Sequence, residues 1–293
     1  MKRVLLLLAA IGFWCCGCDK PAASPASRQQ FLARGVVKEI KSNSLLVAHE
    51  EITNYMPAMT MSFRARQTNE LAGLNAGDEI SFRLVVTADQ SWIEQIRKTG
   101  ARSVAPLSPL PQPTNKPAQF RLTDIPDFMF TNEFGQRVSL RQFQGQALAF
   151  TFFFTRCPIP EYCPRLAKNF QGASERLVQM SDAPTNWHLL SISFDPFDTP
   201  AALRAYAQSY HYNSNHWTFL TGPVAQVRDF ADGFGVRITP EGGTFTHNFR
   251  TVVFDAAGRL QNSWMIGGDT TDHLVSEILQ AAQARENHAA SRR

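Results

Sequence analysis

Short runs of alternating apolar and polar residues fill the first third of the chain. They cover residues 35–40, 44–50, 60–66, 78–87 and 91–98. Turn-forming residues separate the runs, as at 41–43 and 75–77. Alternation with a period of two predicts strands that bury one face. Five such strands in about 70 residues predict a small antiparallel β-barrel with an OB-like form.

The pattern changes after residue 119. Apolar runs without turn residues predict strands, and apolar positions at helical spacing predict helices. The expected strands are 147–154, 188–194, 217–220 and 251–254. The expected helices are 164–180, 200–210, 224–234 and 271–285. This alternation predicts a sheet covered by helices, and therefore an α/β domain.

A proline-rich stretch separates the two patterns. Residues 101–118 carry five prolines and no hydrophobic periodicity, which predicts a stiff, partly polyproline linker or a peptide ligand for another domain. We therefore expect a multidomain chain: a signal peptide at 1–18, a β-barrel at 28–98, a linker at 99–118 and the α/β domain at 119–285.

Composition agrees with a folded, two-domain protein. The 293 residues are 44% hydrophobic and 18% charged, as in globular proteins. The net charge of +4 is small and spread along the chain. Without a basic-aromatic stripe, it gives no reason to predict nucleic-acid binding.

The N-terminus predicts export. Lys2 and Arg3 precede an apolar run, 4–14, that is too short to cross a bilayer but suits a secretory signal. The following Cys-Cys-Gly-Cys resembles a bacterial lipoprotein signal, which implies lipid attachment at Cys18, with Cys16 as an alternative. An ordinary cleaved signal peptide is the other interpretation. The lipoprotein resemblance implies a periplasmic protein anchored to the membrane.

Only two cysteines, Cys157 and Cys163, lie outside the signal region. They fall in a loop between a predicted buried strand and a predicted helix, whose N-terminus favours the thiolate form. In an oxidising compartment the simplest interpretation is a structural disulfide. One short-loop disulfide adds little to a domain of this size. A dithiol at the tip of the first long strand also indicates a thioredoxin-like sheet, so we favour a working pair.

His247 is the candidate third ligand. It follows the glycine-rich segment 242–246, which we expect to be a loop before the strand at 251–254. In a thioredoxin-like fold this loop approaches the dithiol, and two thiolates with one imidazole suit copper, as Cu(I) or Cu(II). Pattern alone favours a solvated surface histidine.

Residues 120–283 resemble the Sco/SenC family. Matching segments include 125–128, 154–158, 163–164, 195–196, 198–200, 217–222, 234–236 and 247–248. The resemblance implies a thioredoxin-like copper protein that serves assembly of the binuclear copper centre of cytochrome oxidase, with ligands at Cys157, Cys163 and His247. Two spacings differ from the family: five residues separate the cysteines instead of three, and the segment 195–199 is one residue shorter.

A second candidate site lies in the small domain. Met59 and Met61 are two residues apart, so they share one face of a strand, and thioethers are soft ligands for Cu(I). The alternative is that both methionines fill the barrel interior. This stretch resembles the CusF-type periplasmic copper-binding domain, which implies His49, Met59 and Met61 as ligands. Met56 replaces the tryptophan that the family places over the metal, and it is a possible third thioether or a shield.

The sequence therefore predicts a membrane-tethered copper chaperone that delivers copper to a cytochrome oxidase copper-centre subunit or another copper-accepting protein. The alternative is a thiol–disulfide oxidoreductase that uses Cys157 and Cys163 to reduce cysteines of a partner. We also expect Cu(I) to pass from the methionines to the dithiol, because thioethers hold copper while the cysteines are oxidised. Asp195 and Asp198 could tune the cysteines, but the sequence favours a role for Asp198 and Thr199 in capping the helix that starts near residue 200.

Overall fold

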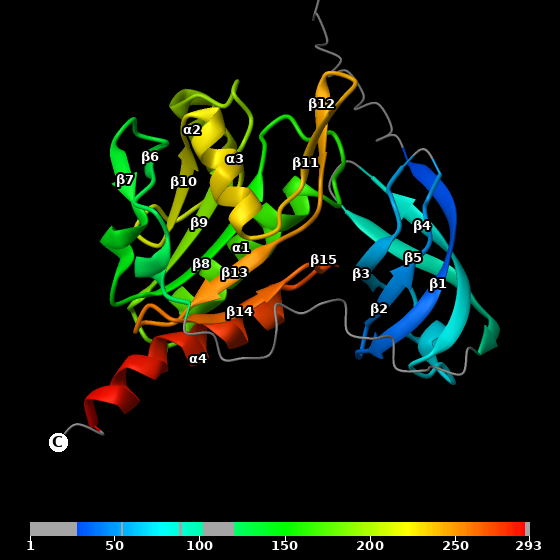
Figure 1. The fold of residues 1–293 in the computed structure, drawn as a ribbon. Helices are drawn as coiled ribbons and strands as arrows, with labels where there is room; N and C mark the ends of the chain where they lie inside the picture. The colour runs from blue at the N-terminus through cyan, green and yellow to red at the C-terminus, as the bar shows by residue number, and fades with distance from the viewer. Residues whose placement is uncertain (1–27, 54, 88–89, 102–119, 291–293) are drawn as a thin grey trace, which may run out of the picture.

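The computed structural model describes residues 28–53, 55–87, 90–101 and 120–290, and Figure 1 shows two sheet domains beside each other. The predicted fold class is confirmed: a small antiparallel β domain is followed by an α/β domain with a thioredoxin-like arrangement. The predicted signal peptide and most of the predicted linker lie outside the described residues.

The small domain contains the five predicted strands. They are β1 (Gln29–Ile40), β2 (Ser44–His49), β3 (Met59–Arg64), β4 (Asp78–Val86) and β5 (Ser91–Ala101). They follow the antiparallel order β3-β2-β1-β4-β5, and a bridge from Ala65 to Ile93 connects the end of β3 to β5. A short 3-10 helix, η1 (Thr68–Leu71), follows β3.

Two strands are longer than the pattern predicted. β1 starts at Gln29 because residues 29–34 pair with 81–86 of β4, although their side chains are largely exposed and do not alternate cleanly. β5 runs to Ala101, past the predicted end at residue 98. Inside the barrel, Val37, Leu45 and Val47 are completely buried, so the period-two pattern did identify the core.

The large domain is built on a seven-stranded mixed sheet of order β14-β13-β8-β9-β10-β6-β7. The central strands β8 (Ala147–Phe153), β9 (Trp187–Ser193) and β10 (Trp217–Thr221) are parallel. β13 (Thr251–Phe254) pairs antiparallel with β8. All four correspond to predicted strands.

Three outer strands were not predicted. They are the edge strands β7 (Arg137–Ser139) and β14 (Leu260–Trp264), and β6 (Met129–Asn132), which lies between β10 and β7. Each has five residues or fewer, which is too short for a periodic pattern to develop. Two short 3-10 helices, η2 (Leu122–Asp124) and η3 (Leu140–Phe143), complete this edge of the domain.

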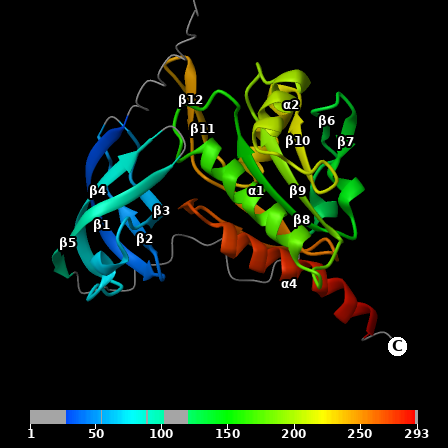
Figure 2. The same ribbon diagram turned by 180° about the vertical axis from the view of Figure 1, so that it is seen from behind.

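Four helices cover the sheet, as predicted: α1 (Cys163–Gln179), α2 (Pro200–Ser209), α3 (Val224–Gly233) and α4 (Thr271–Ala290). Alternate residues of β8 face opposite sides, so Phe150 and Phe152 contact Phe230 of α3 whereas Phe153 contacts Tyr206 of α2. Helices α1 and α4 pack against each other, and Figure 2 shows α1 lying across the face opposite α3.

The expected loop before β13 is instead a β-hairpin. β11 (Ile238–Glu241) pairs with β12 (Thr244–His247), and Gly242 and Gly243 form the turn with positive φ values of 55° and 82°. These φ values require glycine, which explains the glycine pair. His247 is therefore the last residue of a strand, and it is buried, so the prediction of a solvated loop histidine is wrong.

A two-residue strand from the large domain joins the small sheet. β15 (Gly267–Gly268) pairs in parallel with β3, with Gly267 opposite Met61 and Gly268 opposite Ser62. From the other side, the Asn169 side chain of α1 donates to the Gly268 carbonyl at 2.8 Å. The large domain therefore supplies an edge strand to the sheet of the small domain, which the sequence pattern did not predict.

In the part of the chain that the structure describes, none of the helices combines the length and the apolar character needed to span a bilayer.

Replacing Phe230 with alanine tests the packing of the large domain. This side chain is 2% exposed and contacts rings on β6 and β8, so Phe230→Ala should lower the free energy of unfolding by about 3–5 kcal/mol. Val178→Ala, at a 54% exposed position on α1, is the matched control and should change it by about 0.5 kcal/mol or less. Urea denaturation measures both, and equal losses would contradict the assigned core.

Candidate metal centre

Two carboxylates hold the backbone that leads into the cysteines. Asp198 accepts hydrogen bonds from the Thr155 backbone at 2.9 Å and from the Thr155 hydroxyl at 2.5 Å. Asp195 accepts from the Arg156 guanidinium at 2.7 Å. Thr199, not Asp198, caps α2 through its side chain. The aspartates therefore fix the start of the cysteine loop, which we define as residues 155–162.

The two cysteines are free thiols in different environments. Cys163 is the first residue of α1 and is fully buried, whereas Cys157 is half-buried and its thiol points to the Ile159 carbonyl at 3.8 Å. Hydrogen bonds from the Cys163 thiol and backbone lower the pKa of Cys157 to about 7. Burial raises the pKa of Cys163. One accessible thiolate thus stands beside one protected thiol.

The hairpin β11–β12 brings His247 to Cys163. The His247 Nε2 atom lies 3.5 Å from the Cys163 sulfur, and Nδ1 lies 3.1 Å from the Asn248 carbonyl. Burial lowers the pKa of His247 to about 4, so the ring is neutral at pH 7. A carbonyl only accepts hydrogen bonds, so Nδ1 carries the proton and Nε2 offers its lone pair toward the sulfur.

The structure brings Cys163 to His247 and places Cys157 beside Cys163. Across the described residues, however, no three His, Cys, Asp or Glu side chains are already arranged to hold a metal ion. The Cys157 sulfur accepts a hydrogen bond from the Cys163 thiol and also lies 3.8 Å from the Ile159 carbonyl. A centre with all three ligands therefore requires a side-chain adjustment that brings Cys157 and His247 together beside Cys163.

The small domain gathers its four candidate residues at the end of β2 and the start of β3. His49 pairs directly with Met59, and Met61 lies two residues further along the same strand. His49, Met56 and Met61 are buried, and Met59 is half-buried. Met56 lies in the connection between β2 and β3, where it bridges to Ile52 and belongs to the same buried cluster as Met61. The strand register therefore places an imidazole on one face with two thioether-bearing residues, and a third packs in the same core.

His49 repeats the geometry of His247. Its Nδ1 atom lies 2.6 Å from the carbonyl of the next residue, Glu50, and burial lowers the pKa of its ring. Its Nε2 atom is buried and has no hydrogen-bond partner among the described residues. An unpaired polar atom of this kind costs about 1–3 kcal/mol. A soft metal ion bound at Nε2 would remove that cost, so these residues fit a metal.

Residues of the cysteine loop contact the small domain, and the sequence pattern did not predict a role for these residues. The Tyr55 hydroxyl donates to the Glu161 carboxylate, and the Tyr162 hydroxyl lies 3.9 Å from the Met59 sulfur. Ile159 also packs against the core of the small domain. The available signal was the cysteine spacing of five residues, because the additional residues form this contact.

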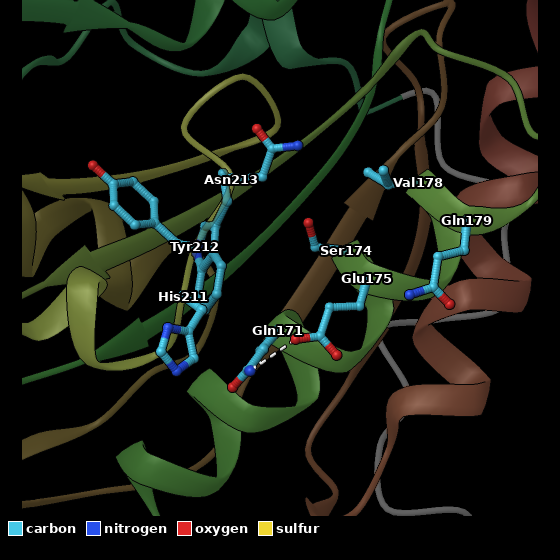
Figure 3. Close-up of a pocket in the computed structure, with 9 residues that line it drawn as sticks. Gln171, Ser174, Glu175, Val178, Gln179, His211, Tyr212 and Asn213 are labelled. Atoms are coloured by element: carbon cyan, nitrogen blue, oxygen red, sulfur yellow. Dashed lines mark hydrogen bonds between the residues drawn. The ribbon is translucent and has the colours of Figure 1, made fainter.

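A separate hollow of about 180 Å³ lies between α1 and the turn that follows α2 (Figure 3). Gln171 and Glu175 of α1 line it and are hydrogen-bonded at 2.8 Å, and His211 faces them from the turn. The described residues around it include no cysteine or methionine, so it offers no sulfur ligand.

Comparison with known protein families shows to which family the chain belongs. Residues 116–283 match the family model described as SCO1/SenC, and residues 30–98 match the one described as Copper binding periplasmic protein CusF. Because the first match covers more than half of the chain, the chain belongs to the SCO1/SenC family.

A curated relative is the SCO1 protein homolog of Bacillus subtilis (strain 168). It is 28% identical over 110 residues, which are 37% of this chain and 54% of that protein. The chain thus spans about half the length of the curated relative it matches.

Solved structures cover the same part of the chain. A SCO1/SenC family lipoprotein from Bacillus anthracis str. Ames is 22% identical with a TM-score of 0.48, covering 54% of this chain and 94% of that one. Arabidopsis thaliana ScoI with copper bound is 22% identical with a TM-score of 0.44, covering 52% and 96%.

The cysteine environments predict a pH-dependent reactivity. In the reduced protein, alkylation should report one fast thiol whose rate rises with an apparent pKa of about 7. Cys163→Ala removes the donated hydrogen bond, so the pKa of Cys157 should rise and alkylation at pH 7 should slow. Cys163→Ser keeps a hydroxyl donor and is the control. An unchanged profile in Cys163→Ala would show that Cys163 does not stabilise the thiolate.

Proposed function

We propose that this protein is an exported copper chaperone with two copper sites on one chain. The large-domain site binds copper through Cys157, Cys163 and His247. The small-domain site binds Cu(I) through His49, Met59 and Met61, with Met56 beside them. One observation carries the proposal: both histidines are held at Nδ1 by the next residue's carbonyl, which leaves Nε2 unpartnered in His49 and facing the Cys163 sulfur in His247.

The large-domain site works only in its reduced form. Copper requires thiolates, so each cysteine that becomes a ligand releases its proton, and a disulfide offers no ligand. Cys163 already contacts both Cys157 and His247, so a side-chain adjustment that brings Cys157 toward His247 completes the set. The thiolate character of Cys157 supports this step because little energy is needed to deprotonate it at pH 7.

The small-domain site keeps copper in the reduced state. Thioethers are neutral and soft, so they favour Cu(I) over hard cations. The buried Nε2 atom of His49 supplies the nitrogen ligand without losing a proton. The match of residues 30–98 to a copper-binding family supports this assignment.

A lipid on Cys18 tethers the chaperone to the membrane on the periplasmic side. The copper acceptor is a cytochrome oxidase copper-centre subunit or another copper-accepting protein. The apolar N-terminal segment that ends in cysteines supports the anchor, and membership of the SCO1/SenC family supports the acceptor.

Thiol–disulfide exchange is the second candidate, and the cysteine environments favour it specifically. The Cys157 thiolate would attack a partner disulfide, and a mixed disulfide would form as one partner thiolate leaves. The Cys163 thiol would then lose its proton and displace the second partner thiolate, leaving a Cys157–Cys163 disulfide. An external thiol reductant would restore the dithiol.

Methionine replacement tests the small-domain site. The reduced full-length protein should bind two Cu(I) ions, and Met59→Leu with Met61→Leu should bind one, because leucine keeps the volume but removes the sulfur. Met180→Leu, at an exposed position, is the control and should still bind two. Copper analysis after dialysis gives the count. Two ions in the double variant would assign the methionines to packing alone.

His247 separates the two candidate functions. Copper binding at the dithiol should weaken at least about tenfold in His247→Ala, with altered copper–thiolate absorption, whereas disulfide reduction should persist because exchange needs only sulfur. His273→Ala, on α4 in the same domain and half-buried against Trp264, is the control. Unchanged affinity and absorption in His247→Ala would contradict the three-ligand site.

A further inference from the structure

The cysteine loop lies against the methionine group across the domain boundary, with Tyr162 between the two ligand sets. We propose that the two copper sites form one docked transfer unit, in which Cu(I) passes from the methionines to the dithiol without separation of the domains. This inference rests on the proposed function, and it adds the route of transfer and the residues that create it.

Docking is fixed by backbone contacts that tolerate no side chain. Gly268 has a φ of 80°, and a Cβ atom there would overlap the Ser62 backbone on β3. A Cβ atom at Gly267 would meet the Phe249 ring at 2.5 Å and the Met61 side chain at 2.9 Å. The large domain therefore approaches the methionine strand as closely as two backbones can pair.

Side chains of the cysteine loop form the second part of the contact. Glu161 is 2% exposed, and its carboxylate accepts the Tyr55 hydroxyl. The Tyr55 ring stacks on Phe31 of β1, with centroids 4.2 Å apart. A buried carboxylate loses hydration and depends on this donor, so the hydrogen bond favours the docked arrangement.

Tyr162 touches both ligand sets. Its hydroxyl lies 3.9 Å from the Met59 sulfur, and its ring centroid lies 6.4 Å from that of His247. The next residue in the chain is Cys163, the buried thiol. One tyrosine side chain therefore separates the thioethers from the thiolate site, and a small movement of this ring would join them.

The docked interface also restricts contact with solvent. Met61 is 1% exposed, and the cavity between the domains that it helps to line has a volume of about 140 Å³, with Glu161 and Arg165 also on its wall. This space admits small species but excludes a bulky chelator. Copper that moves inside the docked unit is consequently protected from capture.

Transfer is an exchange of ligands without electron transfer. Copper remains Cu(I) throughout. It gains the sulfurs of Cys157 and Cys163 and Nε2 of His247, and it loses the sulfurs of Met59 and Met61 and Nε2 of His49. Each thiol that binds releases one proton to solvent. The step needs a reduced dithiol, and an external reductant such as a phosphine supplies the two electrons that open the disulfide.

A chelator competition tests the docked route. Full-length protein with oxidised cysteines is loaded with one Cu(I), then mixed with excess phosphine and bathocuproine disulfonate, a bulky anionic Cu(I) chelator. Copper–thiolate absorption reports transfer, and chelator colour reports escape. The chelator concentration that captures half of the copper should be about tenfold lower in Gly268→Val than in the wild type, since this variant opens the interface.

Two controls match the variants. Gly135→Val introduces the same strain, at φ 79°, where a Cβ atom meets nothing, and should behave as the wild type. Tyr55→Phe weakens the interface without a backbone clash, because it removes the hydroxyl that donates to Glu161. This variant provides the test if Gly268→Val does not fold. Tyr212→Phe removes a similar phenol–carboxylate contact, to Glu133, far from the interface.

Each result has one meaning. Easier capture in Gly268→Val or Tyr55→Phe, but not in the controls, supports docked transfer. Equal capture in wild type and both interface variants overturns it. If the oxidised protein holds no Cu(I) before mixing, or the reduced protein develops no copper–thiolate absorption when Cu(I) is supplied directly, then the proposed function itself fails.

Discussion

The parallel pairing of β15 with β3 determines how the two domains meet. Because Gly267 and Gly268 lack side chains, β15 reaches the strand that carries Met61, and Asn169 of α1 holds it from behind. Helix α1 begins at Cys163, so the same helix that supports the sheet junction also carries a thiol. The methionines and the cysteines are thus positioned by one connected set of contacts.

The two groups of candidate ligands share one structural feature, a histidine held by the carbonyl of the next residue. They differ in the sulfur groups beside that histidine, which are thioethers in one group and thiols in the other. In each, a buried neutral histidine donates Nδ1–H to the carbonyl of the next residue, which leaves Nε2 for a metal. Thioethers can bind Cu(I) whether or not the cysteines are oxidised, whereas a dithiol binds copper only after its disulfide is reduced. Each group lies in its own family match, the cysteines in SCO1/SenC at 116–283 and the methionines in Copper binding periplasmic protein CusF at 30–98.

Sequence patterns predicted the strands and helices in which apolar residues follow a regular pattern. The barrel strands follow from alternation, and the central strands of the large sheet follow from apolar runs without turn residues. The direct pairing of His49 with Met59 was not predicted. β15 could not be predicted, because two glycines carry no hydrophobic pattern. The burial of His247 depends on a short hairpin, and the roles of Glu161 and Tyr162 depend on a domain about 100 residues earlier in the chain. Such long-range contacts leave no periodic pattern, and the five-residue cysteine spacing does not show which residues they join.

The central claim is that two copper sites lie on either side of Tyr162. Anomalous diffraction at the copper edge from crystals of the reduced, copper-loaded protein tests it most directly. The account predicts two copper peaks, one among His49, Met59 and Met61 and one beside Cys163 and His247, with the Tyr162 ring between them. A single peak, or a peak whose ligands exclude the methionines or the cysteines, would contradict it.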